Sequence, residues 1–482
     1  MELEALIRAL APSEVVGARP LEIDDLAYDT RRLAPGSLFF CVAGARVDGH
    51  DLAGAAVERG APALVVEHLL ELDVPQLVVP DARAAMAVAA DAFFGEPTKE
   101  LAVAGVTGTN GKTTTVFLLH AMLEAAGRRC GLVGTVEWIV GGEHRPAPFT
   151  TPEAIDLQRL FREMLDEGDR SAAIEASSHG SALGRLDRVR FGALVFTNLS
   201  QDHLDLHGTM DEYFQAKRRL FTGAQPPPAA VNVGNEWGRR LASDLAEAHR
   251  APLVTFGLEA SAEVWAEGLE LTSRGSRFTA AGMALETPLR GLFNVENALG
   301  AVAAALLLDL PEDAVVEGLA AVETVPGRFE TIDEGQPFSV LVDYSHTPAS
   351  LETALRSARG LAEGRVLVVF GAGGDRDRGK RPLMGKVAAT LADVAIVTSD
   401  NPRSEDPIAI IQDVLQGAGT GVEIDPDRRS AIERAVGLAE PGDVVLIAGK
   451  GHEQGQEIDG VIHPFDDRVV AREALAALAA SR

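Results

Sequence analysis

The segment GTNGKTTT at residues 108–115 has the residue types and spacing of a phosphate-binding loop. It follows the apolar run LAVAG and precedes VFLLHAMLEAAG, which gives the strand, loop and helix order that such a loop requires. Lys112 can neutralise the β- and γ-phosphates, and the Thr113 hydroxyl can bind magnesium. The first glycine of the common pattern lies one place early, at Gly105, so the loop is a variant. We predict that nucleotide phosphates contact Gly108, Thr109, Asn110, Gly111, Lys112, Thr113 and Thr114.

Two further segments place carboxylate and imidazole groups directly after apolar runs. Glu175 begins EASSH, and His203 lies within TNLSQDHLDLH. Because parallel strands end at one edge of a sheet, we expect both side chains beside the phosphate loop. Magnesium takes few protein ligands, which makes both residues candidate ligands. His203 and His207 are four residues apart, but no third nitrogen or sulfur ligand at helpful spacing favours zinc.

These residues alone leave the reaction open. A phosphate loop suits a kinase, a transporter ATPase or a ligase, because a fold element does not fix the chemistry. Lys217 lies in the helix-forming segment YFQAKRRLF, and its residue type alone predicts a solvated side chain. The reaction must therefore be inferred from the whole set of motifs.

The elements that would position these residues are short apolar runs separated by Ala-, Leu- and Glu-rich helical stretches, a pattern that predicts α/β domains with parallel sheets. Breaks at FGEPTK, before residue 100, and at VPGR, ending at Arg328, predict three domains, 1–97, 98–327 and 328–482. The expected strands are LFFCVAG, ALVVE, QLVVP, LAVAGVTG, SAAIEASS, GALVFTNLS, RVLVVFGAGG, VAIVTSD and DVVLIAGKG.

Composition limits the partners of the chain. Its 482 residues carry a formal charge of −27, which disfavours nucleic-acid binding. Cys41 and Cys130 have no CxxC spacing, so we expect two buried thiols. The N-terminal residues lack the features of a signal peptide, and no apolar run is long enough to span a bilayer. We expect a cytoplasmic protein that binds small molecules, without membrane insertion.

The motifs, in their order, resemble those of the Mur ligase family over nearly the whole chain. They are DTRR, TGTNGKTTT, EASSHG, TNLSQDHLDLHGTMDEYFQAKRRLF, FNVENA, VPGRFE, DYSHTP, GAGGDRDRGKRPLM, SDNPR and GKGHE. The resemblance implies an N-terminal UDP-binding α/β domain, a central ATPase domain with a parallel-rich sheet, and a C-terminal Rossmann-like domain. It also implies an ATP-dependent amide-bond ligase of peptidoglycan synthesis, acting as a monomer.

The resemblance assigns further residues to three ligands. Around ATP it adds Asn294, Asn297, Arg328, Asp343 and His346. Around a UDP-linked muramoyl dipeptide it places Thr30, Thr150, Thr151, Ser177 and Arg185. Around a diamino acid it places Arg376, Asp400, Asn401, Pro402, Arg403, Gly449 and Glu453.

The resemblance also changes the role expected for Lys217, which matches a lysine that family members carry as a carbamate. This CO2 adduct, N6-carboxylysine, turns a cation into a carboxylate that can face magnesium, whereas an ammonium would repel the metal. The resemblance thus implies two magnesium ions. The set of residues predicted to hold them is Thr113, Glu175, His203 and carbamylated Lys217.

Arg403 favours meso-diaminopimelate as the diamino acid. Its guanidinium can grip the distal carboxylate, which lysine and ornithine lack, while Glu453 can pair with the distal ammonium. Lysine or ornithine remains the alternative substrate. Other readings are a folylpolyglutamate-type ligase, the ligase that adds the preceding D-glutamate, and a nucleotide-binding protein without catalysis.

Overall fold

The computed structural model describes residues 1–44, 47–223, 225–272, 274–419 and 421–481. Within them helices alternate with strands, and each expected apolar run coincides with a strand. The predicted α/β class is therefore confirmed. Among the described residues, no helix has the length and apolar character needed to cross a membrane.

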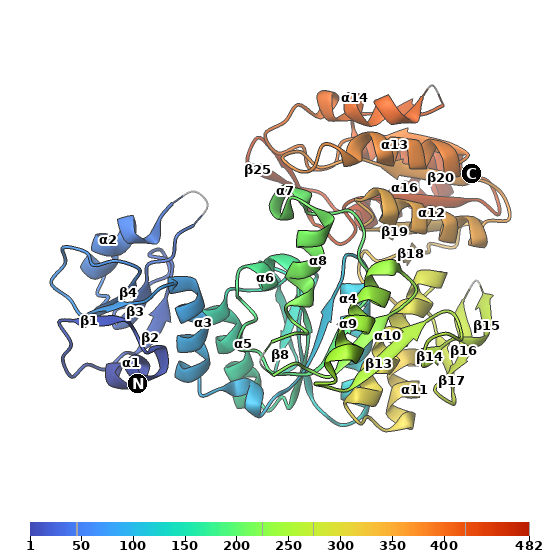
Figure 1. The fold of residues 1–482 in the computed structure, drawn as a ribbon. Coiled ribbons are helices and arrows are strands. Elements are labelled where there is room, and N and C mark those ends of the chain that lie inside the picture. The colour runs from blue at the N-terminus through green and yellow to red at the C-terminus, as the bar shows by residue number, and fades with distance from the viewer. Residues whose placement is uncertain (45–46, 224, 273, 420, 482) are drawn as a thin grey trace. The chain divides into compact units, whose positions relative to one another are not determined.

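The N-terminal region forms a five-stranded sheet with helices on both faces (Figure 1). Its elements are α1 (Leu3–Leu10), β1 (Glu14–Val16), β2 (Asp25–Ala27), β3 (Ser37–Phe40), η1 (Gly49–Leu52), α2 (Ala53–Glu58), β4 (Ala63–Val66), β5 (Gln76–Val78), α3 (Ala82–Phe93) and η2 (Pro97–Lys99). The strand order is β1-β5-β4-β3-β2, and only β1 pairs antiparallel. Leu38 and Phe40 share a core with α1 and α3, whereas Phe39 lies in the core with α2. Because both faces of the sheet are buried, successive residues of β3 are all apolar.

The central region contains a nine-stranded sheet of order β14-β13-β12-β11-β6-β10-β7-β8-β9. Its strands are β6 (Ala102–Thr107), β7 (Cys130–Val133), β8 (Glu137–Val140), β9 (Glu143–Pro146), β10 (Ser171–Glu175), β11 (Phe191–Phe196), β12 (Ala229–Asn232), β13 (Leu253–Gly257) and β14 (Val264–Trp265). Strand β10 pairs parallel with both β6 and β7, whereas β8 and β9 continue the edge antiparallel.

Helices and a small sheet complete the central region. The helices are α4 (Lys112–Ala125), α5 (Ala154–Asp166), α6 (Ser178–Ala182), α7 (Leu204–His207), α8 (Met210–Arg218), α9 (Glu236–Ala248), α10 (Leu292–Leu307) and α11 (Glu312–Ala321). An antiparallel sheet contains β15 (Glu267–Thr272), β16 (Gly275–Ala280) and β17 (Met283–Thr287). Helix α10 is buried over most of its length, which agrees with its alanine-rich apolar sequence.

The C-terminal region is a six-stranded sheet of order β18-β19-β23-β20-β21-β22 between two layers of helices (Figure 1). Its elements are β18 (Glu330–Ile332), β19 (Ser339–Asp343), α12 (Pro348–Leu361), β20 (Val366–Phe370), α13 (Lys380–Leu391), β21 (Val394–Val397), α14 (Pro407–Ala418), β22 (Glu423–Ile424), α15 (Arg428–Leu438), β23 (Val444–Ala448) and α16 (Asp467–Ser481). Helices α12, α13 and α14 share one core, and α15 and α16 share the other. The hairpin of β24 (Gly455–Ile458) and β25 (Val461–Pro464) follows β23.

The chain divides into two compact units. One contains Met1–Val106, Gly127–Leu194 and Ala216–Pro228, and the other contains Thr107–Ala126, Val195–Gln215 and Ala229–Arg482. The predicted phosphate loop therefore belongs to the second unit.

Candidate active site

The predicted phosphate loop connects a buried strand to a helix, as expected. Strand β6 ends at Thr107, and α4 begins at Lys112. Between them, Gly111 has a φ of 87°, a left-handed conformation that favours glycine, and it caps the helix. The start of α4 directs backbone N–H groups out of the helix, and such a helix end can bind an anion.

The ammonium of Lys112 folds back over this loop. Its Nζ donates to the carbonyl oxygens of Gly108 at 3.1 Å and Thr109 at 2.8 Å. The positive charge of Lys112 is thus held at the loop itself.

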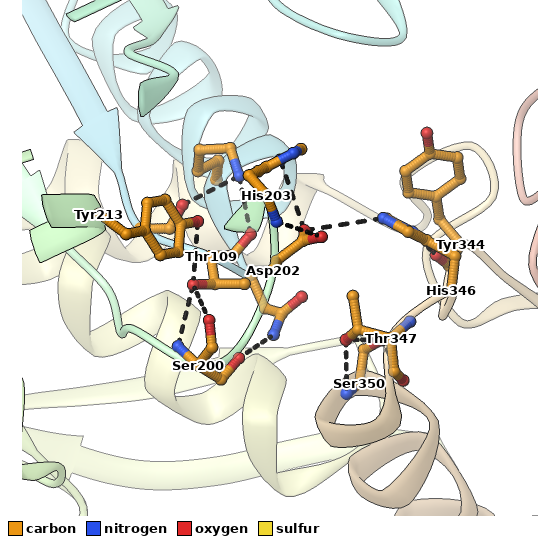
Figure 2. A network of polar contacts seen from close by, with 12 residues as sticks. Thr109, Ser200, Asp202, His203, Tyr213, Tyr344, His346, Thr347 and Ser350 are labelled. Carbon is orange, nitrogen blue, oxygen red and sulfur yellow. Dashed lines mark hydrogen bonds and ion pairs between the residues drawn. The ribbon is translucent and has the colours of Figure 1, made fainter. Parts of the chain in front are cut away.

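Residues after β11 fix the other side of the loop. The Asn198 side-chain oxygen accepts from the Asn110 N–H at 3.0 Å, and the Thr197 hydroxyl donates to the Asn110 carbonyl at 2.6 Å. The Thr109 hydroxyl lies 3.2 Å from the Tyr213 hydroxyl, and accepts from the Ser200 N–H at 3.0 Å (Figure 2). The loop is therefore ordered by side chains from the segment that carries His203.

Asn294 and Asn297 lie at the start of α10, and the structure brings Asn297 to the loop. A Cβ on Gly111 would lie 2.2 Å from the Asn297 side-chain oxygen, so only glycine allows this approach. Asn297 donates to Asn294 at 3.0 Å, and Asn294 donates to the Arg290 carbonyl at 2.8 Å. Both amides are buried and aligned in one chain of hydrogen bonds.

Arg328 joins the loop to the C-terminal sheet. Its Nη2 donates to the Thr113 hydroxyl at 3.0 Å, and its guanidinium lies over the Tyr344 ring, 4.4 Å from the ring centroid. Asp343, at the end of β19, accepts from the Phe329 N–H at 2.8 Å. Arg328 thus contacts the start of α4 although the two segments are 215 positions apart in the sequence.

A carboxylate that the sequence interpretation did not single out lies between two histidines (Figure 2). Asp202 Oδ2 is 3.4 Å from His203 Nε2 and 3.8 Å from His346 Nε2. Burial raises the pKa of Asp202, but His346, His203 and Lys380 outweigh it, so the pKa is lowered. Burial and the charge of Lys380 lower the pKa of His346. Asp202 therefore ionises more readily than an ordinary aspartate, whereas burial favours the neutral form of His346.

Glu175 is the centre of a second polar cluster, in the first compact unit. Its carboxylate accepts from the Thr135 N–H at 2.8 Å and the Thr135 hydroxyl at 3.0 Å, and that hydroxyl lies 3.0 Å from the Thr150 hydroxyl. The Thr151 hydroxyl donates to the Glu175 carbonyl at 2.7 Å. Glu175 is fully buried, so these contacts are shielded from water.

The residues predicted to hold the muramoyl dipeptide join this cluster. Arg185 donates to the Thr151 carbonyl at 2.8 Å and pairs with Glu153 at 2.8 Å. The Ser177 N–H donates to the Thr151 hydroxyl at 3.2 Å, and the Ser177 hydroxyl caps α6. Thr30 lies apart in sequence, between β2 and β3, where its carbonyl accepts from Arg59 at 2.6 Å.

Lys217 is buried, so the solvated side chain expected from its residue type is wrong. Its residue is only 1% exposed, near the end of α8. The neighbouring Ala216 carbonyl accepts from the Ser181 hydroxyl of α6. Tertiary packing of α8, which single-residue propensity does not describe, determines this burial.

The predicted diamino-acid residues meet after β21 and β23. Asn401 donates to Glu453 Oε2 at 2.8 Å, and Lys450 Nζ donates to the Asn401 side-chain oxygen at 2.9 Å and to Glu453 Oε2 at 3.1 Å. Gly449 has a φ of 120°, and a Cβ there would lie 2.4 Å from Asp400 Oδ2. Only glycine suits both this conformation and this approach.

Arg403 and Arg376 lie on the loops around this group. Arg403 donates to the Gly374 carbonyl at 2.7 Å and pairs with Glu457 at 3.3 Å, while Arg376 donates to the Asp375 carbonyl at 3.2 Å. Pro402 precedes Arg403, whose φ of 53° is unusual for a residue with a side chain. The guanidinium of Arg403 thus has partners at both Nη1 and Nε.

Lys380, Lys450 and Glu457 were not assigned roles from the sequence, although all three lie close to the predicted site. Lys380 and Lys450 are buried. Each directly follows a glycine, in the motifs GAGGDRDRGKRPLM and GKGHE, and this glycine–lysine pair could have pointed to both residues. Burial lowers the pKa of Lys380, and the opposing effect of Asp202 and Asp400 is smaller. Glu457 carried no signal, since its contacts with residues 401–403 span more than fifty positions.

The predicted magnesium ligands divide between the compact units. Thr113 and His203 belong to one, and Glu175 and Lys217 to the other. Within the described part of the chain, no three His, Cys, Asp or Glu side chains form a metal-binding group. A hydroxyl, an imidazole and carboxylates are nonetheless donors that suit magnesium with phosphate oxygens and water completing its coordination.

Comparison with known families gives matches along most of the chain. Residues 22–116 match the family described as Mur ligase family, catalytic domain, and residues 106–305 match the Mur ligase middle domain. Residues 327–451 match the family described as Mur ligase, glutamate ligase domain.

Individual relatives extend this likeness. A protein of Geobacillus thermodenitrificans (strain NG80-2), called UDP-N-acetylmuramoyl-L-alanyl-D-glutamate--2,6-diaminopimelate ligase, is 49% identical and covers 98% of this chain and 99% of its own. A protein of Streptomyces coelicolor with the same name is 45% identical over 94% of this chain and 92% of its own. A solved structure with that name has a TM-score of 0.68 at 34% identity and covers 95% of each chain.

Proposed function

This chain belongs to the Mur ligase family, and we propose that it joins meso-2,6-diaminopimelate to the γ-carboxylate of D-glutamate in UDP-MurNAc-L-Ala-D-Glu. The reaction consumes ATP, releases ADP and phosphate, and forms an amide bond of a peptidoglycan precursor. The names of relatives at 43–49% identity support both the reaction and the substrate.

The observation that carries the substrate choice is the group formed by Arg403, Asn401 and Glu453. Glu453 is oriented by Asn401 at 2.8 Å, and one edge of the Arg403 guanidinium is fixed by the Gly374 carbonyl. The guanidinium can take the distal carboxylate of diaminopimelate in competition with Glu457, while Glu453 takes the distal ammonium. Lysine and ornithine would leave Arg403 without that partner.

The phosphate loop supplies the electrostatics of the first step. The γ-carboxylate oxygen attacks the γ-phosphorus of ATP, the bond to ADP breaks, and an acyl phosphate forms. Both reactants are anions, so the Lys112 ammonium, held at the loop by two carbonyls, offsets their repulsion. The amine then attacks the acyl carbon, phosphate leaves, and the nitrogen loses a proton.

Two magnesium ions would add to this charge neutralisation, held by Thr113, His203, Glu175 and a carbamate on Lys217. Lys217 is buried, so a carbamate there would be shielded from bulk water. Glu175, also buried, has its carboxylate already oriented by Thr135.

We assign the three predicted domains to the three ligands. Residues 1–97 bind the UDP-linked substrate, 98–327 bind ATP, and 328–482 bind the diamino acid. An ATP-consuming ligase of nucleotide-linked precursors works in the cytoplasm, and we propose that it does so as a monomer.

Phosphate release by the purified protein tests this proposal directly. The assay contains ATP, magnesium and UDP-MurNAc-L-Ala-D-Glu, with meso-diaminopimelate, lysine or ornithine added separately. We expect release that depends on diaminopimelate and is lost in Lys112→Met. Release with lysine or ornithine but not diaminopimelate would reject the substrate, and release that needs no amino acid would reject the ligase reaction.

A further inference from the structure

The hairpin of β24 and β25 is bonded to the loop that carries Arg403. The Arg403 N–H donates to the Glu457 carbonyl at 3.0 Å, and the Asp459 N–H donates to the Arg403 carbonyl at 2.7 Å. Gln456 donates to the Asp400 carbonyl at 2.7 Å, and the Glu457 N–H donates to the Asn401 side-chain oxygen at 3.0 Å. The hairpin therefore fixes the backbone of this loop on both sides of Arg403.

This backbone pairing also places the Glu457 side chain against the Arg403 guanidinium. Glu457 Oε2 lies 3.3 Å from Arg403 Nε, while Arg403 Nη1 donates to the Gly374 carbonyl at 2.7 Å. The Arg403 side chain is 22% exposed and that of Glu457 39% exposed, so both charges can reach an incoming ligand. Arg403 thus already has an anionic partner before any substrate arrives.

Lys450 and Glu453 form a second pair of opposite charges next to the loop that carries Arg403. Glu453 Oε2 is held by Lys450 at 3.1 Å and by Asn401 at 2.8 Å. Arg403 and Lys450 are therefore each already paired with a carboxylate. The distal carboxylate of a substrate must therefore compete with Glu457 for the Arg403 guanidinium.

We propose that Glu457 is a specificity-determining residue, an internal counter-ion that weakens the selection of diaminopimelate by Arg403. This inference rests on the proposed function. A distal carboxylate gains less from Arg403 because Glu457 has already neutralised part of its charge. A diamino acid without that carboxylate loses less, because Arg403 keeps Glu457 as its partner. Glu457 therefore lowers the ratio of kcat/KM for diaminopimelate to kcat/KM for a diamino acid without the distal carboxylate.

The variant Glu457→Gln removes this charge and keeps the shape and the backbone bonds of the hairpin. We expect the ratio of kcat/KM for meso-diaminopimelate to kcat/KM for lysine to rise about two- to fivefold, the range for partly exposed pairs. The KM for ATP should not change. In the Arg403→Leu background the same substitution should leave the ratio unaltered, because its effect acts through the guanidinium.

Glu423→Gln is the matched control, since Glu423 pairs with Arg434 at 2.6 Å on β22 with an exposed side chain. It should leave the ratio at the wild-type value. A Glu457→Gln ratio that is unchanged or lower, or an equal rise in the Arg403→Leu background, would overturn the inference alone. Failure of the wild type to use diaminopimelate would instead overturn the proposed function, and the inference with it.

Discussion

Removing one partner of the buried Arg428–Asp467 pair should open the end of the C-terminal sheet. Arg428 Nε and Nη2 donate to Asp467 at 2.8 and 2.7 Å, and neither side chain is exposed. Arg428 also donates to the carbonyls of Ala448 at 3.0 Å and Ser399 at 3.4 Å, the residues directly before the two loops of the proposed diamino-acid pocket. One guanidinium therefore holds the ends of β21, β23 and the start of α16.

The magnitude follows from this complete burial. Asp467→Leu leaves a guanidinium without its carboxylate, and breaking a buried pair in this way costs about 3–5 kcal/mol. Two charge-assisted hydrogen bonds at about 1.5–3 kcal/mol each give about 3–6 kcal/mol, which overlaps this range. Arg428→Met/Asp467→Leu removes both charges and should cost much less than the sum of the single variants.

Hydrogen exchange measured by mass spectrometry on peptides covering Val444–Ala448 is the appropriate assay, because a chain with several cores need not unfold in two states. A local loss of about 3–5 kcal/mol corresponds to exchange faster by about two to three and a half orders of magnitude. Arg429→Met is the control, since its exposed pair with Glu473 should contribute about 0.2–1 kcal/mol. The reasoning is refuted if Asp467→Leu exchanges at the wild-type rate. It is also refuted if the double variant loses as much free energy of protection as the two single variants together.

Three further outcomes are expected. Lys217→Ala should lose phosphate release, with partial recovery by a short carboxylic acid and none by bicarbonate; a fully active variant would exclude the carbamate. Hydrogen bonding with Arg381 lowers the pKa of Glu405 to about 2. Its contribution to stability is therefore present above the ordinary pKa of about 4.5 and lost as pH falls towards 2, and Glu405→Gln should flatten acid unfolding in that window. Burial raises the pKa of the Cys41 thiol to about 12, so in the native protein at pH 8 it should react with a thiol reagent far more slowly than after unfolding.

Local patterns in the sequence were enough to predict the phosphate loop, because strand, glycines, lysine and helix lie within one continuous segment. The apolar runs likewise predicted nine strands that pair parallel, whose burial leaves a plain signal, whereas the parallel strands β7, β12, β13 and β19 were missed. The antiparallel additions β8, β9 and β15 to β17 were not predicted, since their alternating and polar residues resemble loops. The environments of Asp202 and Lys217 could not be predicted either, because the residues that surround them are distant in the sequence.

Specificity in this pocket depends on residues that the motifs do not mark. Asn401 and Arg403 belong to a recognisable motif, but their orientation depends on the hairpin at residues 455–464, which lies outside the motifs. Two chains could therefore share the motif and differ in the charge facing Arg403. The motif then identifies the side chain that can bind a carboxylate. On this proposal, the affinity of Arg403 for that carboxylate depends on Glu457, the counter-ion that the hairpin supplies. Ornithine or lysine use by a chain with this motif would thus be explained first at position 457.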